Sequence, residues 1–373
     1  MNNEGTVAIP HASEAESARL SAHRSYGKGD SATPAAHQRS RLIVSLLVGL
    51  ISGHVVLLRT PYFGTPRDLV QFWFASRTLL HGGNPYALIG PGRALDYGWP
   101  FVYPLTSAVA VFPLSGLTST WACAVFAGVG GACFAWALMA SGYASLLALA
   151  SVCYWHAVFI VQWSPLLAAS VVLAPLAFFL AVKPTVGLAY FVARPSWWAI
   201  VGAVVLTATS FALDPHWVAQ WRDAVSRALA VAKHGFPYHV PLFKPGGILV
   251  LAALTRWRRP EARLLVALAC VPHTPLPYDL LPLFLIPRGW WQSASLVVMS
   301  YVMWWLVSRP ELPPDFYQTV IEYARASIPC MYLPCTLMIL RRKNAGPLAS
   351  WLERRAARWP SWLRGSSVSL RPA

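Results

Sequence analysis

Apolar runs long enough to cross a lipid bilayer recur along this chain, and short basic turns separate them. The first run extends from Leu42 to Leu58, and the last from Tyr317 to Leu340. Only 12% of the 373 residues are charged, whereas an average soluble domain has about 25%. A soluble protein of this composition would lack the polar surface needed to cover itself. The pattern therefore predicts an all-α polytopic membrane protein.

The basic residues predict the orientation of this protein in the bilayer. A net charge of +16 would suggest nucleic acid as the partner of a soluble protein. Here Lys and Arg flank the apolar runs, as the positive-inside rule describes, so the expected partner is the lipid bilayer and not nucleic acid. Arg39 and Arg41 precede the first run and place the N-terminus in the cytoplasm. The turns Arg256–Arg259 and Arg341–Lys343 fall on the same side in a map of about ten crossings, in which Tyr103–Leu117 is a re-entrant or surface segment.

Three regions follow from this map. Residues 1–41 are polar and lack the apolar core of a signal peptide, so we expect a disordered cytoplasmic tail. Residues 42–340 form a transmembrane core with external loops at 59–118 and 214–244. Residues 341–373 carry eight Lys or Arg against one acid, Glu353, and are predicted to be a basic cytoplasmic tail on anionic headgroups.

The first external loop holds a helical pattern. The segment Asp68–Leu80 can place Leu69, Phe72, Trp73, Ser76 and Leu80 on one face. It is too short to cross the bilayer, so we expect an amphipathic helix at the membrane surface. The turn residues Gly82–Pro85 end it. Asp68 opens this helix, which leaves two interpretations: a plain N-cap, or a catalytic carboxylate just outside the first span.

Lys183 is the most unusual charge in the chain. It lies inside the run Ser164–Ala193, which would be about 45 Å long as a helix, against about 30 Å of bilayer core. A lysine at this depth, beside the helix-breaking Pro184, is expected to face a cavity and a partner. A lipid-linked phosphate is one such partner. The alternative is that the side chain reaches back to the cytoplasmic interface.

Other motifs narrow the chemistry. His273 and Asp279 lie six residues apart with two prolines between them, so they could line the mouth of a pocket. Gln162 precedes the broken run on the same predicted side. No phosphate-binding loop, dinucleotide fingerprint, zinc-protease motif or serine-hydrolase elbow occurs in the sequence. The six cysteines lie in or beside apolar runs without a C-x-x-C pair, so we interpret them as packing residues and expect no metal or disulfide framework.

Taken in order, these motifs resemble glycosyltransferase family 87. The resemblance covers residues 60 to 290 approximately. It rests on Asp68 early in the loop and on five further segments, namely Leu80–Tyr86, Phe101–Pro104, Val161-Gln162, Ala181–Thr185 and Pro272–Asp279. Two positions depart from the family pattern: Val161 replaces a glycine, and Leu105 replaces the second proline of a Tyr-Pro-Pro motif. The interval from Gln162 to Lys183 is also short.

This resemblance implies a GT-C fold enzyme of the bacterial cytoplasmic membrane with its active site on the external face. Such enzymes transfer a sugar, often mannose, from a polyprenyl-phosphate donor to a glycolipid or glycan acceptor. We expect no cofactor. Asp68 is the expected catalytic base. The residues expected to bind the donor's phosphate and sugar are Lys183, His273, Tyr278, Asp279, Gln162 and Arg67. Those expected to serve the acceptor or the loop are Asn84, Tyr86 and Tyr103.

Two other function classes fit the same features. A transporter or flippase for lipid-linked sugars would use the broken helix and Lys183 for binding without chemistry. A membrane scaffold would need no small-molecule site. The absence of two inverted halves and the acid-bearing external loop favour the enzyme.

Overall fold

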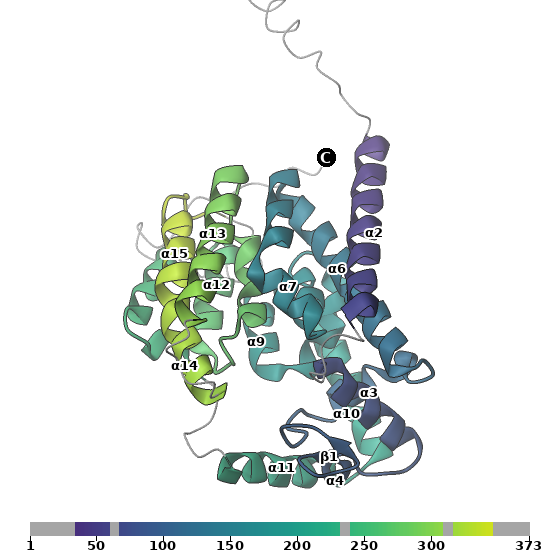
Figure 1. Ribbon diagram of the computed structural model, residues 1–373. Helices are drawn as coiled ribbons and strands as arrows, with labels where there is room; N and C mark the ends of the chain where they lie inside the picture. Colours follow the sequence, from purple (N-terminus) through teal and green to yellow (C-terminus); the bar gives the residue numbers. More distant parts are fainter. Residues whose placement is uncertain (1–33, 60–66, 232–238, 309–315, 346–373) are drawn as a thin grey trace, which may run out of the picture. The chain divides into compact units, whose positions relative to one another are not determined.

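A computed structural model describes residues 34–59, 67–231, 239–308 and 316–345 (Figure 1). Most of the two predicted cytoplasmic tails, residues 1–33 and 346–373, lies outside the described residues. The chain divides into two compact units, residues 1–43 and 44–373. In the first unit only the beginning of one helix is described, so the account below concerns the second.

The described chain is mostly helical and has almost no strands, as the sequence predicted. Its α-helices are α2 (Pro34–Arg59), α3 (Asp68–Leu80), α4 (Pro85–Leu88), α5 (Thr106–Val109), α6 (Ser119–Leu138), α7 (Val152–Phe159), α8 (Ser164–Ala169), α9 (Pro184–Ala193), α10 (Trp197–Leu213), α11 (Trp217–Val231), α12 (Pro260–Cys270), α13 (Trp290–Val307), α14 (Phe316–Ser327) and α15 (Leu333–Leu340). Two short parallel strands, β1 (Ile89–Gly90) and β2 (Leu95–Asp96), pair Ile89 with Leu95.

Tighter helical segments connect many of these helices. They are η1 (Phe112–Leu114), η2 (Met139–Ser141), η3 (Tyr143–Ala150), η4 (Ala174–Val182), η5 (Pro241–Phe243), η6 (Gly247–Arg256) and η7 (Pro277–Leu285); a wider turn, η8 (Ile328–Tyr332), joins α14 to α15. Tight helical turns of this kind are common as connectors.

Within the described residues, two helices are long and apolar enough to cross a membrane. They are His37–Arg59 and Ser119–Ser141. A third crossing is possible if α10 and α11 form one span, although they meet at an angle of 94°. The prediction of about ten crossings is therefore not confirmed by the lengths of the helices.

The reason for the difference is that several predicted spans are broken. The run Ser164–Ala193 consists of α8, η4 and α9. Pro175 and Pro184 each lie in the first turn of a new segment, where a missing N–H is tolerated, and neither can continue the helix before it. The apolar stretch 143–159 is divided as well, because η3 ends at Ala150 and the Ser151 hydroxyl caps α7. The predicted run Tyr317–Leu340 is likewise divided at η8.

The helix predicted in the first external loop is present with the predicted bounds, but its buried face differs. Leu69, Phe72 and Ser76 are buried as expected. Leu80, however, is 54% exposed, and Leu79 is buried in its place. The face therefore follows the i, i+3, i+7, i+10 positions that start at Leu69. The helix ends at Leu80, and the chain turns away at Gly82, whose φ of +72° suits glycine.

The two predicted external loops meet in the structure. Helix α11 bends away from α10 and lies beside α4 (Figure 1). The Trp221 indole donates to the carbonyl of Val102 at 2.8 Å. The Arg227 guanidinium donates to the carbonyl of Tyr86 at 3.2 Å. The segment Tyr103–Leu117 contains only α5 and η1, so it is not one continuous span.

Helix α2 packs closely on α6 because glycines face each other. A Cβ atom added at Gly49 would lie 2.7 Å from the carbonyl oxygen of Gly128. One turn later, a Cβ atom at Gly53 would lie 2.9 Å from the carbonyl oxygen of Ala124. Small residues four apart allow this approach in membranes, where helices gain association energy from close packing. A hydrogen bond of 2.6 Å between the hydroxyls of Ser52 and Tyr154 ties α2 to α7.

We predict that Gly49→Leu destabilises the protein by about 1–3 kcal/mol, because the added side chain meets backbone that cannot move aside. Ile51→Leu is the matched control, since it installs the same residue on the same helix at a position that is 54% exposed. Thermal unfolding in detergent measures both. Equal unfolding temperatures for the two variants would contradict the close contact of α2 with α6.

Candidate functional site

Asp68 is held at the start of α3 by its backbone. Its N–H donates to the carbonyl of Ile160 at 2.8 Å, which ties α3 to the end of α7. Arg67 occupies the N-cap position, and no side chain caps the helix. The interpretation of Asp68 as a plain N-cap is therefore wrong, because its carboxylate is engaged elsewhere.

The carboxylate of Asp68 accepts two side-chain hydrogen bonds. The Tyr97 hydroxyl donates to Oδ1 at 2.5 Å, and the Gln162 amide donates to Oδ2. Burial raises the pKa of Asp68 above its ordinary value, while the hydrogen bond from Tyr97 and the nearby charge of Lys183 oppose that rise. A carboxylate with a raised pKa is a stronger base than a solvated one.

Gln162 reaches Asp68 from a strained turn between α7 and α8. Val161 has a φ of +54°, and no other non-glycine residue in the described ranges has a positive φ. This conformation is costly for a β-branched side chain. The corresponding position is glycine in the family that the sequence resembles, and glycine would adopt it without that cost. The turn directs Gln162, which is 2% exposed, toward both Asp68 and Lys183.

Lys183 stands at the junction of η4 and α9 and is only 7% exposed. Its ammonium donates to Oε1 of Gln162 at 2.9 Å and to Oδ1 of Asp279 at 3.5 Å. It also lies 5.1 Å from the centre of the Tyr278 ring. The alternative in which this side chain extends to the cytoplasmic interface is wrong, since the charge is buried against a carboxylate.

Asp279 completes the array from the first turn of η7. It is 5% exposed, and the Ser164 hydroxyl donates to the same Oδ1 atom at 3.2 Å. Asp68 and Asp279 are thus joined through one amide, Gln162, and one ammonium, Lys183. Four segments far apart in sequence supply this array: the start of α3, the turn before α8, the end of η4 and the start of η7.

A cavity of about 270 Å³ opens beside this array, and we call it the lysine cavity. It is lined by Val102, Tyr103, Pro104, Lys183, Pro184, Thr185, Val186, Trp221, Val225, Pro272, His273, Thr274, Tyr278 and Asp279. Both predicted external loops contribute to it. Asp68 and Gln162 do not line it but adjoin it through Lys183.

The structure separates the predicted site residues into groups. Lys183, Tyr278, Asp279, His273 and Tyr103 share the lysine cavity. His273 is 1% exposed; its Nδ1 lies 3.0 Å from the carbonyl of Val271 and its Nε2 lies 3.3 Å from the Tyr332 hydroxyl. The imidazole is therefore anchored on both sides.

The remaining predicted residues serve the loop. The Arg67 guanidinium donates to the carbonyl of Val56 at 2.6 Å and does not line a described cavity, so its assignment to the donor site is not supported. Asn84 caps α4 by accepting from the N–H of Tyr86 at 2.8 Å. The Tyr86 hydroxyl donates to the carbonyl of Tyr103 at 3.1 Å.

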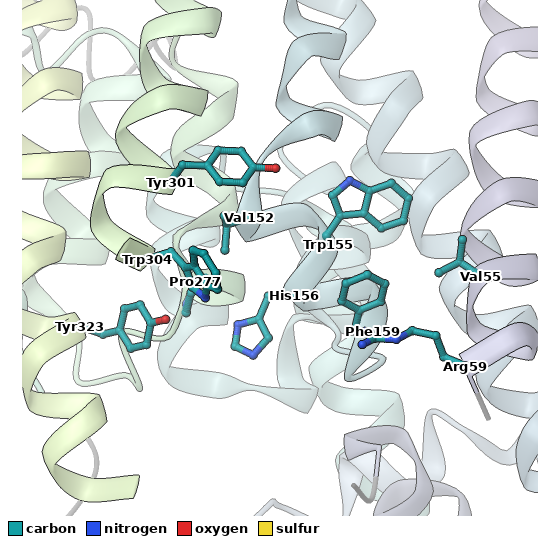
Figure 2. Close-up of a pocket in the computed structure, with 10 residues that line it drawn as sticks. All are labelled: Val55, Arg59, Val152, Trp155, His156, Phe159, Pro277, Tyr301, Trp304 and Tyr323. Carbon is teal, nitrogen blue, oxygen red and sulfur yellow. The ribbon is translucent and has the colours of Figure 1, made fainter. Parts of the chain in front are cut away.

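A larger and mostly apolar cavity of about 660 Å³, which we call the apolar cavity, lies between α2, α7, α13 and α14 (Figure 2). It is lined by Val55, Arg59, Val152, Trp155, His156, Phe159, Pro277, Tyr301, Trp304 and Tyr323. In Figure 2, His156 lies between the Trp155–Phe159 side and the Tyr301, Trp304 and Tyr323 side. Its Nδ1 is buried and has no hydrogen-bond partner within the described part of the chain.

The rings of His156 and Tyr278 stand between the two cavities. Their centres lie 5.3 Å apart, and His156 lines the apolar cavity whereas Tyr278 lines the lysine cavity. Sequence reasoning missed His156, and it also missed Tyr97 and Ser164 as partners of the two carboxylates. The sequence marked two of these positions only weakly: an aromatic pair precedes His156, and turn residues surround Tyr97.

We predict that Lys183→Met destabilises the empty protein by about 3–5 kcal/mol, because it leaves the Asp279 carboxylate buried without its cation. The double variant Lys183→Met/Asp279→Leu should recover part of that loss, since both charges are then removed. Unfolding in detergent measures the change. An unpaired buried lysine would behave differently, because its removal would leave no carboxylate without a partner and would cost little stability.

Arg325→Met is the control for the loss of an ion pair at the surface. Arg325 pairs with Glu322 at 3.0 Å, and its side chain is 59% exposed. Its removal should change stability by no more than about 1 kcal/mol. A Lys183→Met variant as stable as Arg325→Met would contradict the buried pair.

Comparisons with protein-family models, with curated protein sequences and with solved structures return no match to this chain. The relation to glycosyltransferase family 87 therefore rests on the sequence motifs alone.

Proposed function

We propose that this protein is a polytopic membrane glycosyltransferase of the GT-C type. It transfers a sugar from a polyprenyl-phosphate donor to a glycolipid or glycan acceptor, with inversion at the anomeric carbon. The observation that carries the proposal is the buried array Asp68–Gln162–Lys183–Asp279 beside a cavity that both predicted external loops line. The array supplies one base and one cation, which are the two groups that this reaction needs.

Lys183 is the group that receives the donor's phosphate. An ammonium has three N–H donors, and two of them serve Gln162 and Asp279. Because Lys183 lines the lysine cavity, the third can serve a phosphate oxygen there. Asp279 keeps the ammonium paired while the site is empty, so the cation is positioned before the donor arrives.

Asp68 is the proton acceptor. An acceptor hydroxyl attacks the anomeric carbon, its proton passes to the Asp68 carboxylate, and the bond from the anomeric carbon to the phosphate oxygen breaks. The bonding electrons leave with the polyprenyl phosphate, whose added charge Lys183 stabilises. The raised pKa of Asp68 suits this role, because a stronger base accepts the proton more readily.

The apolar cavity supports a lipid-linked substrate. Its lining is largely aromatic and aliphatic, and it adjoins the lysine cavity at His156 and Tyr278. A polyprenyl chain could lie there while its phosphate reaches Lys183. A polyprenyl chain that leaves the bilayer needs a lining of this kind, because it would leave the groups of a polar lining unpaired.

The breaks in the helices beside Lys183 favour one alternative, a transporter for the same lipid-linked sugar. Discontinuous helices with buried charges are common at transport sites. Incubating the purified protein in vesicles with a polyprenyl-phosphate sugar separates the two functions. Release of polyprenyl phosphate together with a glycosylated product supports the enzyme. Movement of the intact donor across the membrane supports the transporter.

We predict that Asp68→Asn lowers transfer by at least about a hundredfold, because a positioned carboxylate base contributes about 10²–10⁴-fold. Asparagine still accepts from Tyr97 but cannot take the proton. The variant should remain folded and bind the donor normally. Asp96→Asn is the control in the same loop, because Asp96 is exposed and its Oδ1 accepts only a turn hydrogen bond from the N–H of Gly92.

Transfer assays on detergent-purified protein, with thermal unfolding recorded in parallel, measure this difference. Near-normal transfer by Asp68→Asn would exclude Asp68 as the base. Asp279, the carboxylate that lines the lysine cavity, would then be the next candidate for the base.

We predict that Tyr97→Phe moves the acid limb of the transfer rate to higher pH. The Tyr97 hydroxyl favours the ionised form of Asp68, so its removal raises the pKa of Asp68 further. Catalysis needs the ionised carboxylate, so activity is lost as the pH falls through that pKa. The wild-type rate should therefore fall at a pH above the ordinary pKa of an aspartate. The rate of the variant should fall at a pH that is higher again. The plateau at high pH should remain. A pH–rate profile for kcat measures the shift, and an unmoved acid limb would contradict it.

A further inference from the structure

A third cavity lies between the first external loop and α11. Its volume is about 190 Å³, and we call it the outer polar cavity. It is lined by Asn84, Tyr86, Ala87, Arg93, Gln220, Asp223 and Arg227. Drug-sized ligands occupy cavities of about 300–1,000 Å³, so this volume suits a single small ring.

Gln220 presents an unfilled acceptor in this cavity. Its Oε1 atom is buried and accepts no hydrogen bond from any described residue, whereas its Nε2 donates to Asp214 at 3.3 Å. An unpaired carbonyl oxygen in a buried position is destabilising unless a ligand or a water donates to it. The amide is held by Asp214, so this acceptor has a defined orientation.

Donors and a second acceptor surround it. Arg93 donates to the carbonyl of Ala87 at 2.8 Å, and Arg227 donates to the carbonyl of Tyr86 at 3.2 Å. Each guanidinium has five N–H donors, so each retains donors for a ligand. Asp223 has no hydrogen bond or ion pair to another residue in the described part of the chain, which leaves its carboxylate as an acceptor.

Helix α11 connects this cavity with the lysine cavity. Gln220, Asp223 and Arg227 follow an i, i+3, i+7 spacing and share one face. Trp221 and Val225 lie on the adjacent face and line the lysine cavity. The hydrogen bond from Tyr86 to the carbonyl of Tyr103 joins the two linings from the loop side.

We propose that the outer polar cavity binds one hexose ring of the acceptor glycan, outside the reacting centre. A sugar ring carries neighbouring hydroxyls that each donate and accept. Arginine donors that alternate with amide and carboxylate acceptors match that arrangement, whereas an apolar chain would leave them all unpaired. The assignment of the ring to the acceptor rests on the proposed glycosyl transfer. Binding of a sugar ring does not.

The test measures binding of methyl α-mannoside and methyl β-glucoside to the full-length protein in detergent, by saturation-transfer NMR. We expect at least one glycoside to bind, and Gln220→Leu and Arg227→Gln each to weaken it about tenfold or more. Arg222→Gln is the matched control, because Arg222 is exposed on the same helix and does not line the cavity. It should bind the glycoside as the unaltered protein does.

Three results would overturn the proposal. They are no binding of either glycoside at millimolar concentration, equal binding by Gln220→Leu and Arg222→Gln, or complete displacement of the glycoside by inorganic phosphate, which would indicate an anion site. If Gln220→Leu does not fold, Arg227→Gln and Asp223→Asn carry the same test, because both change exposed residues.

A last arm separates this proposal from the proposed function. Glycoside binding should persist in Asp68→Asn, which retains the outer polar cavity. In the active enzyme, Gln220→Leu should raise the acceptor KM about tenfold and leave the donor KM unchanged. If Asp68→Asn still transfers the sugar, the assignment of Asp68 as the base is wrong and the proposed sugar site is unaffected. If the unaltered protein transfers the sugar but binds neither glycoside, the sugar site is wrong and the proposed function is unaffected.

Discussion

The buried ion pair of Lys183 with Asp279 is the interaction on which the candidate site depends. Neither charge can be left alone in a region of low dielectric, because an isolated buried ion costs far more than a surface one. The pair therefore requires the end of η4 and the start of η7 to stay together. Ser164 of α8 and Gln162 of the preceding turn complete the hydrogen bonds that such a pair needs.

This requirement also explains the broken helices. A continuous helix from Ser164 to Ala193 would satisfy its own backbone, but it would have no reason to bring Lys183 to Gln162 and Asp279. The breaks at Pro175 and Pro184 divide the run into segments. The strained turn at Val161 also brings the array together, because it directs Gln162 toward both Asp68 and Lys183. Strain of this kind is common where function needs a fixed geometry.

The three cavities differ in chemistry: one is mostly apolar, one holds the buried ion pair, and one is polar. The apolar cavity reaches the array at His156 and Tyr278, and the outer polar cavity reaches it along α11. The lysine cavity lies between the other two, since Tyr278 in its lining contacts His156 of the apolar cavity and Trp221 in its lining is next to Gln220 of the outer polar cavity. The buried ion pair of Lys183 and Asp279 lines the lysine cavity alone, whereas the charged residues of the outer polar cavity are exposed.

The sequence by itself determined the helical class, the bounds of α3, and the choice of Asp68 and Lys183 as candidate site residues, because hydrophobic period, proline position and a charge within an apolar run are local properties. It could not determine that Lys183 is paired, that Asp68 bonds to Tyr97 and Gln162, or that α11 covers the first loop. Those contacts join residues from 21 to 141 positions apart. The tertiary structure alone decided them, because a buried charge takes whichever partner the packing brings within reach, and sequence distance carries no information about that packing.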